Sequence, residues 1–130
     1  MNKIAVSMYE GMGRGVMALQ HMHAGDVIAI CEVLPLSTED TKLVNQTELQ
    51  YYTFVYNKET AQDCLVLGLG EIFNHSDDAN ASYKLEDYAG RKMMVFTALK
   101  TIYAGEQVFT NYNQDTAVDT AAYINNGSLV

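Results

Sequence analysis

Turn residues divide the chain into short runs that have the composition of β-strands. These runs cover residues 3–9, 16–20, 27–36, 51–57, 63–70, 81–88, 91–99 and 103–112. Each is rich in β-branched, aromatic or other apolar residues, and most are bounded by glycine, asparagine or charged turn residues, a pattern typical of strands. Because the runs follow one another closely, little room is left for long helices. We therefore expect a mostly β fold built from several small sheets.

Two short helices are predicted beside these strands. One spans residues 37–52, where Ser37 or Thr38 can cap a first turn that carries two acidic residues. The second spans residues 114–124, an alanine-rich stretch that stops at an Asn-Asn-Gly sequence.

Length and charge narrow the functional classes. The 130 residues suit a single domain, 1–130, that can fold without metal or disulfide staples. The net charge of −8 opposes direct nucleic-acid binding, which needs a basic surface, and suits either solubility alone or a basic partner. No run of 18 apolar residues is present, so we expect no membrane span and no membrane partner. The expected location is cytoplasmic, or nuclear if the host is eukaryotic.

Cysteine and histidine residues give little support for a metal site. Cys31 and Cys64 lie inside apolar runs, so we expect buried free thiols. His21 and His23 could share one face of a strand, but the turn-like sequence Ala-Gly-Asp follows them directly. The prediction for metal is therefore none.

The segment GMGRG at residues 11–15 places three glycines at alternate positions. Glycine permits positive φ and lets the backbone approach a ligand closely. The spacing differs from the GxGxxG of dinucleotide-binding folds, and a strand-like run follows it in place of a helix. A simple hairpin turn and a ligand-contacting turn both fit this segment.

Polar residues end two of the strand-like runs. GEIFNHS at residues 70–76 places Asn74 and His75 after an apolar run, where they must be hydrogen-bonded locally or contact a ligand. YAGEQVFTNY at residues 103–112 ends on Tyr112, whose hydroxyl can project into a cleft or simply reach water.

Taken together, the motifs resemble those of SET-domain protein lysine methyltransferases. They occur in the same order: GxG first, then FNHS with Asn80 four residues later, then GEQVxxxY. The resemblance covers about residues 9–115 and is greatest to compact, virus-type SET proteins without zinc-binding flanks. It implies a SET-domain fold of several small β-sheets around a C-terminal pseudoknot. It also implies S-adenosyl-L-methionine as cofactor and a lysine in a basic peptide or protein as substrate, a histone tail being one candidate. Compact SET proteins can dimerise, so a homodimer is expected.

The resemblance assigns roles to single residues. The predicted cofactor contacts are Met12, Gly13, Arg14, Asn74, His75 and Tyr112. Tyr112 is also the predicted catalytic residue, which orients the lysine amine and does not act as a strong base. Tyr52 and then Tyr51 are predicted for the lysine channel, although core packing also explains aromatic residues there. Phe73 is expected to pack beneath Asn74 and His75, Asn80 to hold the pseudoknot, and Glu106 to be structural.

Three positions depart from the family pattern. Asp77 stands where the family has cysteine, Ala79 where it has proline, and Thr110 where it often has tyrosine. These departures keep open an alternative, a catalytically silent SET module that binds a peptide or protein partner. A methyltransferase for a non-histone protein is a further alternative. Residues 116–130, which include Tyr123, are expected to form a C-terminal tail that could close the site.

Overall fold

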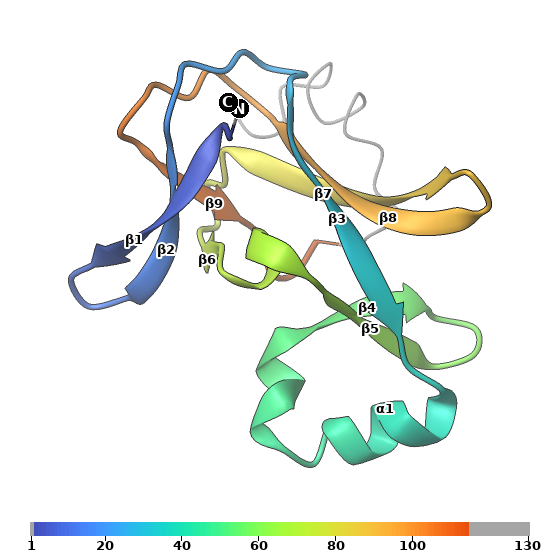
Figure 1. Cartoon of the computed structure of the whole chain (residues 1–130). Coiled ribbons are helices and arrows are strands. Elements are labelled where there is room, and N and C mark those ends of the chain that lie inside the picture. The colour runs from blue at the N-terminus through green and yellow to red at the C-terminus, as the bar shows by residue number, and fades with distance from the viewer. Residues whose placement is uncertain (1, 115–130) are drawn as a thin grey trace.

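The computed structural model describes residues 2–114 and shows two sheets that share one core (Figure 1). The first sheet has the strand order β1-β2-β9-β6 and the second β4-β5-β3-β8-β7. The strands are β1 Ile4–Tyr9, β2 Gly13–Ala18, β3 Val27–Pro35, β4 Thr53–Asn57, β5 Gln62–Val66, β6 Asn74–His75, β7 Ala81–Tyr88, β8 Arg91–Ala98 and β9 Gln107–Thr110. The α-helix is α1 Thr38–Val44, and the 3₁₀ helices are η1 Glu48–Tyr52 and η2 Gly68–Glu71. The expected mostly β architecture is confirmed.

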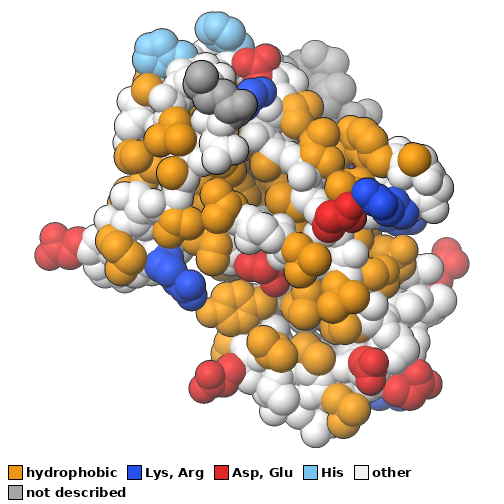
Figure 2. Space-filling model, viewed as in Figure 1, with side chains coloured by type: hydrophobic (Ala, Val, Ile, Leu, Met, Phe, Trp, Pro, Cys, Tyr) orange, Lys and Arg blue, Asp and Glu red, His pale blue; other side chains and the backbone are white. Residues whose placement is uncertain are grey.

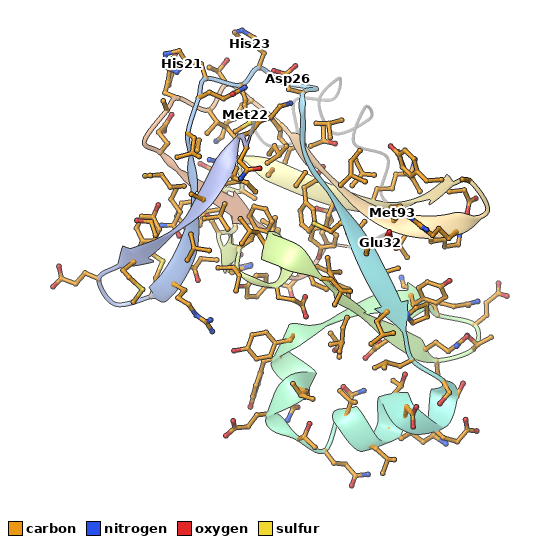
Figure 3. The ribbon with its side chains drawn as sticks, in the orientation of Figure 1. His21, Met22, His23, Asp26, Glu32 and Met93 are labelled. Atoms are coloured by element: carbon orange, nitrogen blue, oxygen red, sulfur yellow. The ribbon has the colours of Figure 1, made fainter. Side chains whose placement is uncertain are left out.

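A single cluster of buried side chains draws on both sheets. Val16 from β2 and Val108 from β9 join Phe96 and Met94 from β8, and all four are fully buried. Met22 adds a long apolar side chain between the sheets and pairs by a backbone bridge with Ile102 (Figure 3). Burying such side chains stabilises the fold by about 1.5–3 kcal/mol each. The two sheets are thus held as one unit, which fixes the position of the segments between them.

The β7–β8 hairpin, drawn in yellow and orange in Figure 1, ends in a two-residue turn with positive φ at both positions. Ala89 has φ 51° and Gly90 φ 85°. This geometry matches the right-handed twist of the strands, which explains why the turn predicted between residues 88 and 91 closes the hairpin without a bulge. Alanine in this conformation is strained because its Cβ crowds the backbone.

Strand β6 lies parallel to β9, with Asn74 opposite Phe109 and His75 opposite Thr110. Because β9 also pairs with β2, the C-terminal strand lies between two segments that come much earlier in the chain. Asn80 holds this crossing: its Oδ1 accepts the Phe109 N–H at 2.8 Å, and its Nδ2 donates to the Gln107 carbonyl at 2.9 Å.

The helix predicted over residues 37–52 is interrupted. Ser37 caps α1 as expected, its hydroxyl accepting the Asp40 N–H at 3.0 Å. The helix ends at Val44, because the Thr47 hydroxyl donates to the Val44 carbonyl at 2.7 Å and caps a separate 3₁₀ turn, η1. Threonine side chains compete for backbone partners in this way and stop helices.

Several predicted strand runs are shorter than expected, and the run 103–112 is a strand only over Gln107–Thr110. Residues 51 and 52 belong to η1, so β4 begins at Thr53. The run 63–70 ends as a strand at Val66, because Gly68 takes a positive φ of 73° and starts η2. The β2 strand, in contrast, begins earlier than predicted, inside GMGRG. The helix predicted at 114–124 and the tail 116–130 lie outside the described residues, apart from Gln114.

Cys31 and Cys64 are buried free thiols, as expected. His21 and His23 lie near Asp26 at one end of the molecule (Figure 3). The His21 Nδ1 accepts the Ala104 N–H at 3.0 Å, whereas His23 uses its backbone N–H to contact Asp26. No helix among residues 2–114 is long and apolar enough to cross a membrane.

Candidate functional site

Two cavities meet where the β1–β2 hairpin, η1, η2 and the end of β9 come together. The larger has a volume of about 290 Å³ and is lined by Gln50, Tyr51, Tyr52, Thr53, Phe54, Val55, Gly70, Glu71, Phe73, Tyr83, Thr110, Tyr112 and Gln114. The smaller has a volume of about 260 Å³ and is lined by Met12, Arg14, Tyr51, Tyr52, Glu71, Ile72, Asn74 and Tyr112. Four residues line both cavities: Tyr51, Tyr52, Glu71 and Tyr112. This shared wall is where two bound molecules can come into contact.

Tyr112 is fixed at the shared wall by two hydrogen bonds. Its backbone N–H donates to Nδ1 of His75 at 2.9 Å, and its hydroxyl donates to the Phe73 carbonyl at 2.5 Å. Burial, and the nearby Tyr52 and Glu71, raise the pKa of Tyr112 above its usual value. The hydroxyl therefore stays protonated near neutral pH, and its free lone pair can only accept a hydrogen bond from a ligand.

His75 has one tautomer that satisfies its contacts. Because Nδ1 accepts the Tyr112 N–H, the ring proton lies on Nε2, which faces the Asp77 carboxylate at 2.8 Å. The His75 and Tyr112 rings are 5.1 Å apart. Asp77, which stands at the family's cysteine position, thus orients the imidazole that positions Tyr112.

Asn74 links the glycine-rich hairpin to β9. Its Nδ2 donates to the Arg14 carbonyl at 3.0 Å and to Gln107 Oε1 at 2.8 Å. The close approach requires a glycine at position 15, where an added Cβ would meet Gln107 Oε1 at 2.5 Å and Asn74 Nδ2 at 2.7 Å. Gly15 and Gln107 are therefore site residues that sequence reasoning missed, although both lie in motifs that it singled out.

The far wall of the larger cavity is aromatic and tightly held. Tyr83 is buried, and Phe54 meets its ring edge to face at 5.0 Å. The Tyr83 hydroxyl lies 3.1 Å from the carbonyls of Asn111 and Gln114, and the Gln114 side chain donates back to the Tyr83 carbonyl at 2.6 Å. These contacts bind the segment after β9 to β7. Such a wall suits the apolar stem of a long side chain.

Glu71 is the unusual residue of the shared wall. Its Oε1 is buried and has no hydrogen-bond partner among the described residues. Burial raises the pKa of Glu71 to about 8. Glu71 belongs to the GEIFNHS motif, but nothing in the sequence shows that its carboxylate is buried in the folded chain.

The structure brings together most of the residues predicted for the site. Met12, Arg14, Asn74 and Tyr112 line the smaller cavity, and Tyr51 and Tyr52 lie on the wall between the cavities. Gly13 and His75 do not line either of the two: Gly13 adopts a positive φ in the hairpin turn, and His75 packs behind Tyr112.

Phe73, Glu106 and Thr110 lie around the site. Phe73 is buried and stacks on Phe96 with ring centres 4.6 Å apart. Glu106 closes a turn by accepting the Tyr103 N–H at 2.7 Å. Thr110, at a position where the family often has tyrosine, is buried and lines the larger cavity.

The smaller cavity fits the chemical groups of S-adenosyl-L-methionine. Arg14 offers a guanidinium for a carboxylate, and Met12 with Tyr51 and Tyr52 offers apolar and aromatic surface for an adenine ring and a sulfonium. The absence of a Cβ at Gly15 keeps the hairpin close to Asn74.

Comparisons with known proteins agree with this geometry. The SET domain family model matches residues 13–113. A Schizosaccharomyces pombe histone-lysine N-methyltransferase described as H3 lysine-37 specific is 35% identical over 104 residues, which cover 79% of this chain and 68% of that protein. A Danio rerio N-lysine methyltransferase, KMT5A-A, is 28% identical over 117 residues, which cover 82% of this chain and 34% of that protein.

A solved structure shares the fold. It is the structure of ctPRC2 in an autoinhibited conformation bound to S-adenosylmethionine. Its sequence is 20% identical to this chain, the TM-score is 0.73, and the match covers 98% of this chain and 17% of that chain. The expected SET-domain fold is thus confirmed, and the class named for both relatives is the expected one, a protein-lysine N-methyltransferase. The chain belongs to the SET domain family.

Proposed function

We propose that this chain transfers a methyl group from S-adenosyl-L-methionine to a protein lysine. The observation that carries the proposal is the wall of Tyr51, Tyr52, Glu71 and Tyr112, which two cavities share. A cofactor in the smaller cavity and a lysine side chain in the larger one can meet there from opposite sides. In-line attack on a sulfonium methyl requires this approach, and alignment of the two reactants accounts for much of the rate enhancement in such reactions.

The cofactor supplies an electrophilic methyl group, and the protein supplies binding and orientation. Met12, Arg14, Asn74 and Tyr112 are the cavity-lining residues we propose for the cofactor, with Arg14 binding its carboxylate. Gly13 and His75 would support them, Gly13 in the glycine-rich segment and His75 behind Tyr112.

Tyr112 is the proposed catalytic residue. Its hydroxyl proton is held by the Phe73 carbonyl, so its oxygen can accept a hydrogen bond from the lysine amine and set the direction of the nitrogen lone pair. Its raised pKa excludes a role as general base near neutral pH. Tyr52 and Tyr51 would flank the lysine stem, and the buried Tyr83 with the partly buried Phe54 would limit the access of water to it.

A histone tail is the substrate class we propose. The acidic chain, with a net charge of −8, attracts a lysine-rich segment, most strongly at low salt. Figure 2 shows apolar side chains in the middle of one face and most acidic side chains towards its edge, an arrangement that suits a basic peptide with an apolar anchor. Nuclear location follows if the host is eukaryotic. A homodimer remains a prediction.

The test is transfer of labelled methyl from S-adenosyl-L-methionine to core histones and to an array of lysine peptides. We expect label on lysine with the parent chain and a loss of about 100-fold or more for Tyr112→Phe. Label on non-histone peptides alone would replace the histone with another protein substrate. Cofactor binding without label on any protein would support the silent binding module.

A further inference from the structure

Glu71 lies in the wall between the two cavities without a structural partner for one of its carboxylate oxygens. It ends η2, and Oε1 is buried with no hydrogen bond among the described residues. An unsatisfied buried oxygen destabilises a fold by about 1–3 kcal/mol. The apolar residues Ile72 and Phe73 follow directly, with Phe73 buried in the core, and neither side chain can act as a hydrogen-bond partner for the carboxylate.

The groups around Glu71 do not neutralise it. Cys31 on β3, Cys64 on β5 and Tyr112 after β9 are all close enough for Glu71 to raise their pKa values, and Tyr52 lies on the same wall. Because their pKa values are raised, Cys31, Cys64 and Tyr112 stay neutral near pH 7. Arg14, which is exposed, lines the smaller cavity together with Glu71. The site therefore offers a carboxyl group whose ionised form an incoming cation would stabilise.

We propose that Glu71 receives the substrate lysine: its carboxylate pairs with the ε-ammonium at the shared wall and then takes one of its protons. This inference rests on the proposed function. In the second step an N–H bond of the ammonium breaks and an O–H bond forms on Glu71, so that a cation and an anion become a neutral amine and a neutral carboxylic acid. The amine that results is the nucleophile that Tyr112 orients.

The pKa values of the proton donor and the proton acceptor are close to each other. A free lysine has a pKa of about 10.4, and a desolvated site beside a sulfonium lowers it. Burial raises the pKa of Glu71 to about 8, which brings donor and acceptor close together. A carboxylate at its ordinary pKa would be a much weaker acceptor.

The probe is n-butylammonium, which has the structure of the lysine side chain, compared with 1-butanol, which lacks the charge. Both are titrated into the full chain saturated with S-adenosylhomocysteine, and affinity is read from NMR shifts. We expect the parent to prefer the ammonium by about tenfold at pH 9 and to lose the preference at pH 6, where Glu71 is protonated. Glu71→Gln should show no preference at either pH, and Glu59→Gln, an exposed acid far along the β4–β5 turn, should match the parent.

A preference that survives in Glu71→Gln would overturn the inference. So would an equal affinity of the parent for both probes at pH 9. A third outcome would also overturn it. Glu71→Gln could keep the preference for the ammonium but change the ratio of its affinities for S-adenosylmethionine and S-adenosylhomocysteine. That result would show that the carboxylate interacts with the sulfonium of the cofactor.

Methyl transfer to the best peptide of the array separates this inference from the proposed function. We expect kcat/KM of the parent to rise with pH through about 8. In Glu71→Gln, kcat/KM at pH 8 should fall at least tenfold and the inflection should move towards the pKa of the lysine itself. Transfer by the parent with an unchanged profile in Glu71→Gln would refute the role of Glu71 alone. No transfer by the parent would refute the proposed function.

Discussion

Replacement of Asn80 by alanine tests whether one amide holds the crossing on which the site depends. The Asn80 side chain forms two hydrogen bonds to the backbone on either side of Val108, at 2.8 Å and 2.9 Å. Alanine removes both and leaves the Phe109 N–H and the Gln107 carbonyl without these partners. Each net hydrogen bond is worth about 1 kcal/mol, and each group left unsatisfied adds to the loss, so we expect Asn80→Ala to lower the free energy of unfolding by about 2–4 kcal/mol.

The assay is equilibrium urea unfolding followed by circular dichroism and tyrosine fluorescence, which the nine tyrosines and the absence of tryptophan make convenient. Asn45→Ala is the matched control, because its exposed amide makes one long contact of 3.4 Å to Asp63. We expect the control to change stability by less than about 0.5 kcal/mol. A loss for Asn80→Ala no larger than for Asn45→Ala would refute the reasoning that this side chain anchors β9.

Three further predictions address the turn, the hairpin and the buried acid. Ala89→Asn should raise the free energy of unfolding by about 0.5–1 kcal/mol in the same urea assay, because asparagine tolerates the positive φ of this turn, and no gain would contradict that conformation. Gly15→Ala should weaken S-adenosylmethionine binding at least tenfold by calorimetry, since the new Cβ displaces the Asn74 amide, whereas unchanged affinity would show that the hairpin can yield. Burial raises the pKa of Glu71 from 4.5 to about 8, so the folded state holds this proton more tightly than the unfolded state does. The resulting stabilisation is fully present below about pH 4.5 and is lost as the pH rises through about 8. The free energy of unfolding of Glu71→Gln should therefore increase relative to that of the parent across this pH range. A difference in stability that does not vary with pH would contradict the burial of this carboxylate.

Local sequence signals predicted the elements that local chemistry decides. The bounds of β7 were predicted to the residue, because an Ala-Gly turn ends it, and Ser37 was one of the two predicted caps of α1. The helix predicted over 37–52 is interrupted for a local reason, the competing hydroxyl of Thr47.

The sequence predicted the site residues that belong to a family motif, and it missed those whose role depends on tertiary packing. Tyr112 and Asn74 came from motifs in their family order, and both line the smaller cavity. The role of Glu71 could not be predicted, because the burial of its carboxylate depends on η2 and on strands distant in sequence. The need for glycine at position 15 likewise depends on Gln107, which lies 92 positions further along the chain and meets it only in the folded protein.

The central claim is that the smaller cavity binds S-adenosyl-L-methionine and that Tyr112 acts on the reaction at its inner wall. Calorimetric titration of the cofactor into the parent chain, Asn74→Ala and Tyr112→Phe, each with and without a lysine-rich histone tail peptide, tests this most directly. We predict binding by the parent in the micromolar range, strong weakening in Asn74→Ala and near-parent affinity in Tyr112→Phe. No cofactor binding by the parent under either condition would contradict the account.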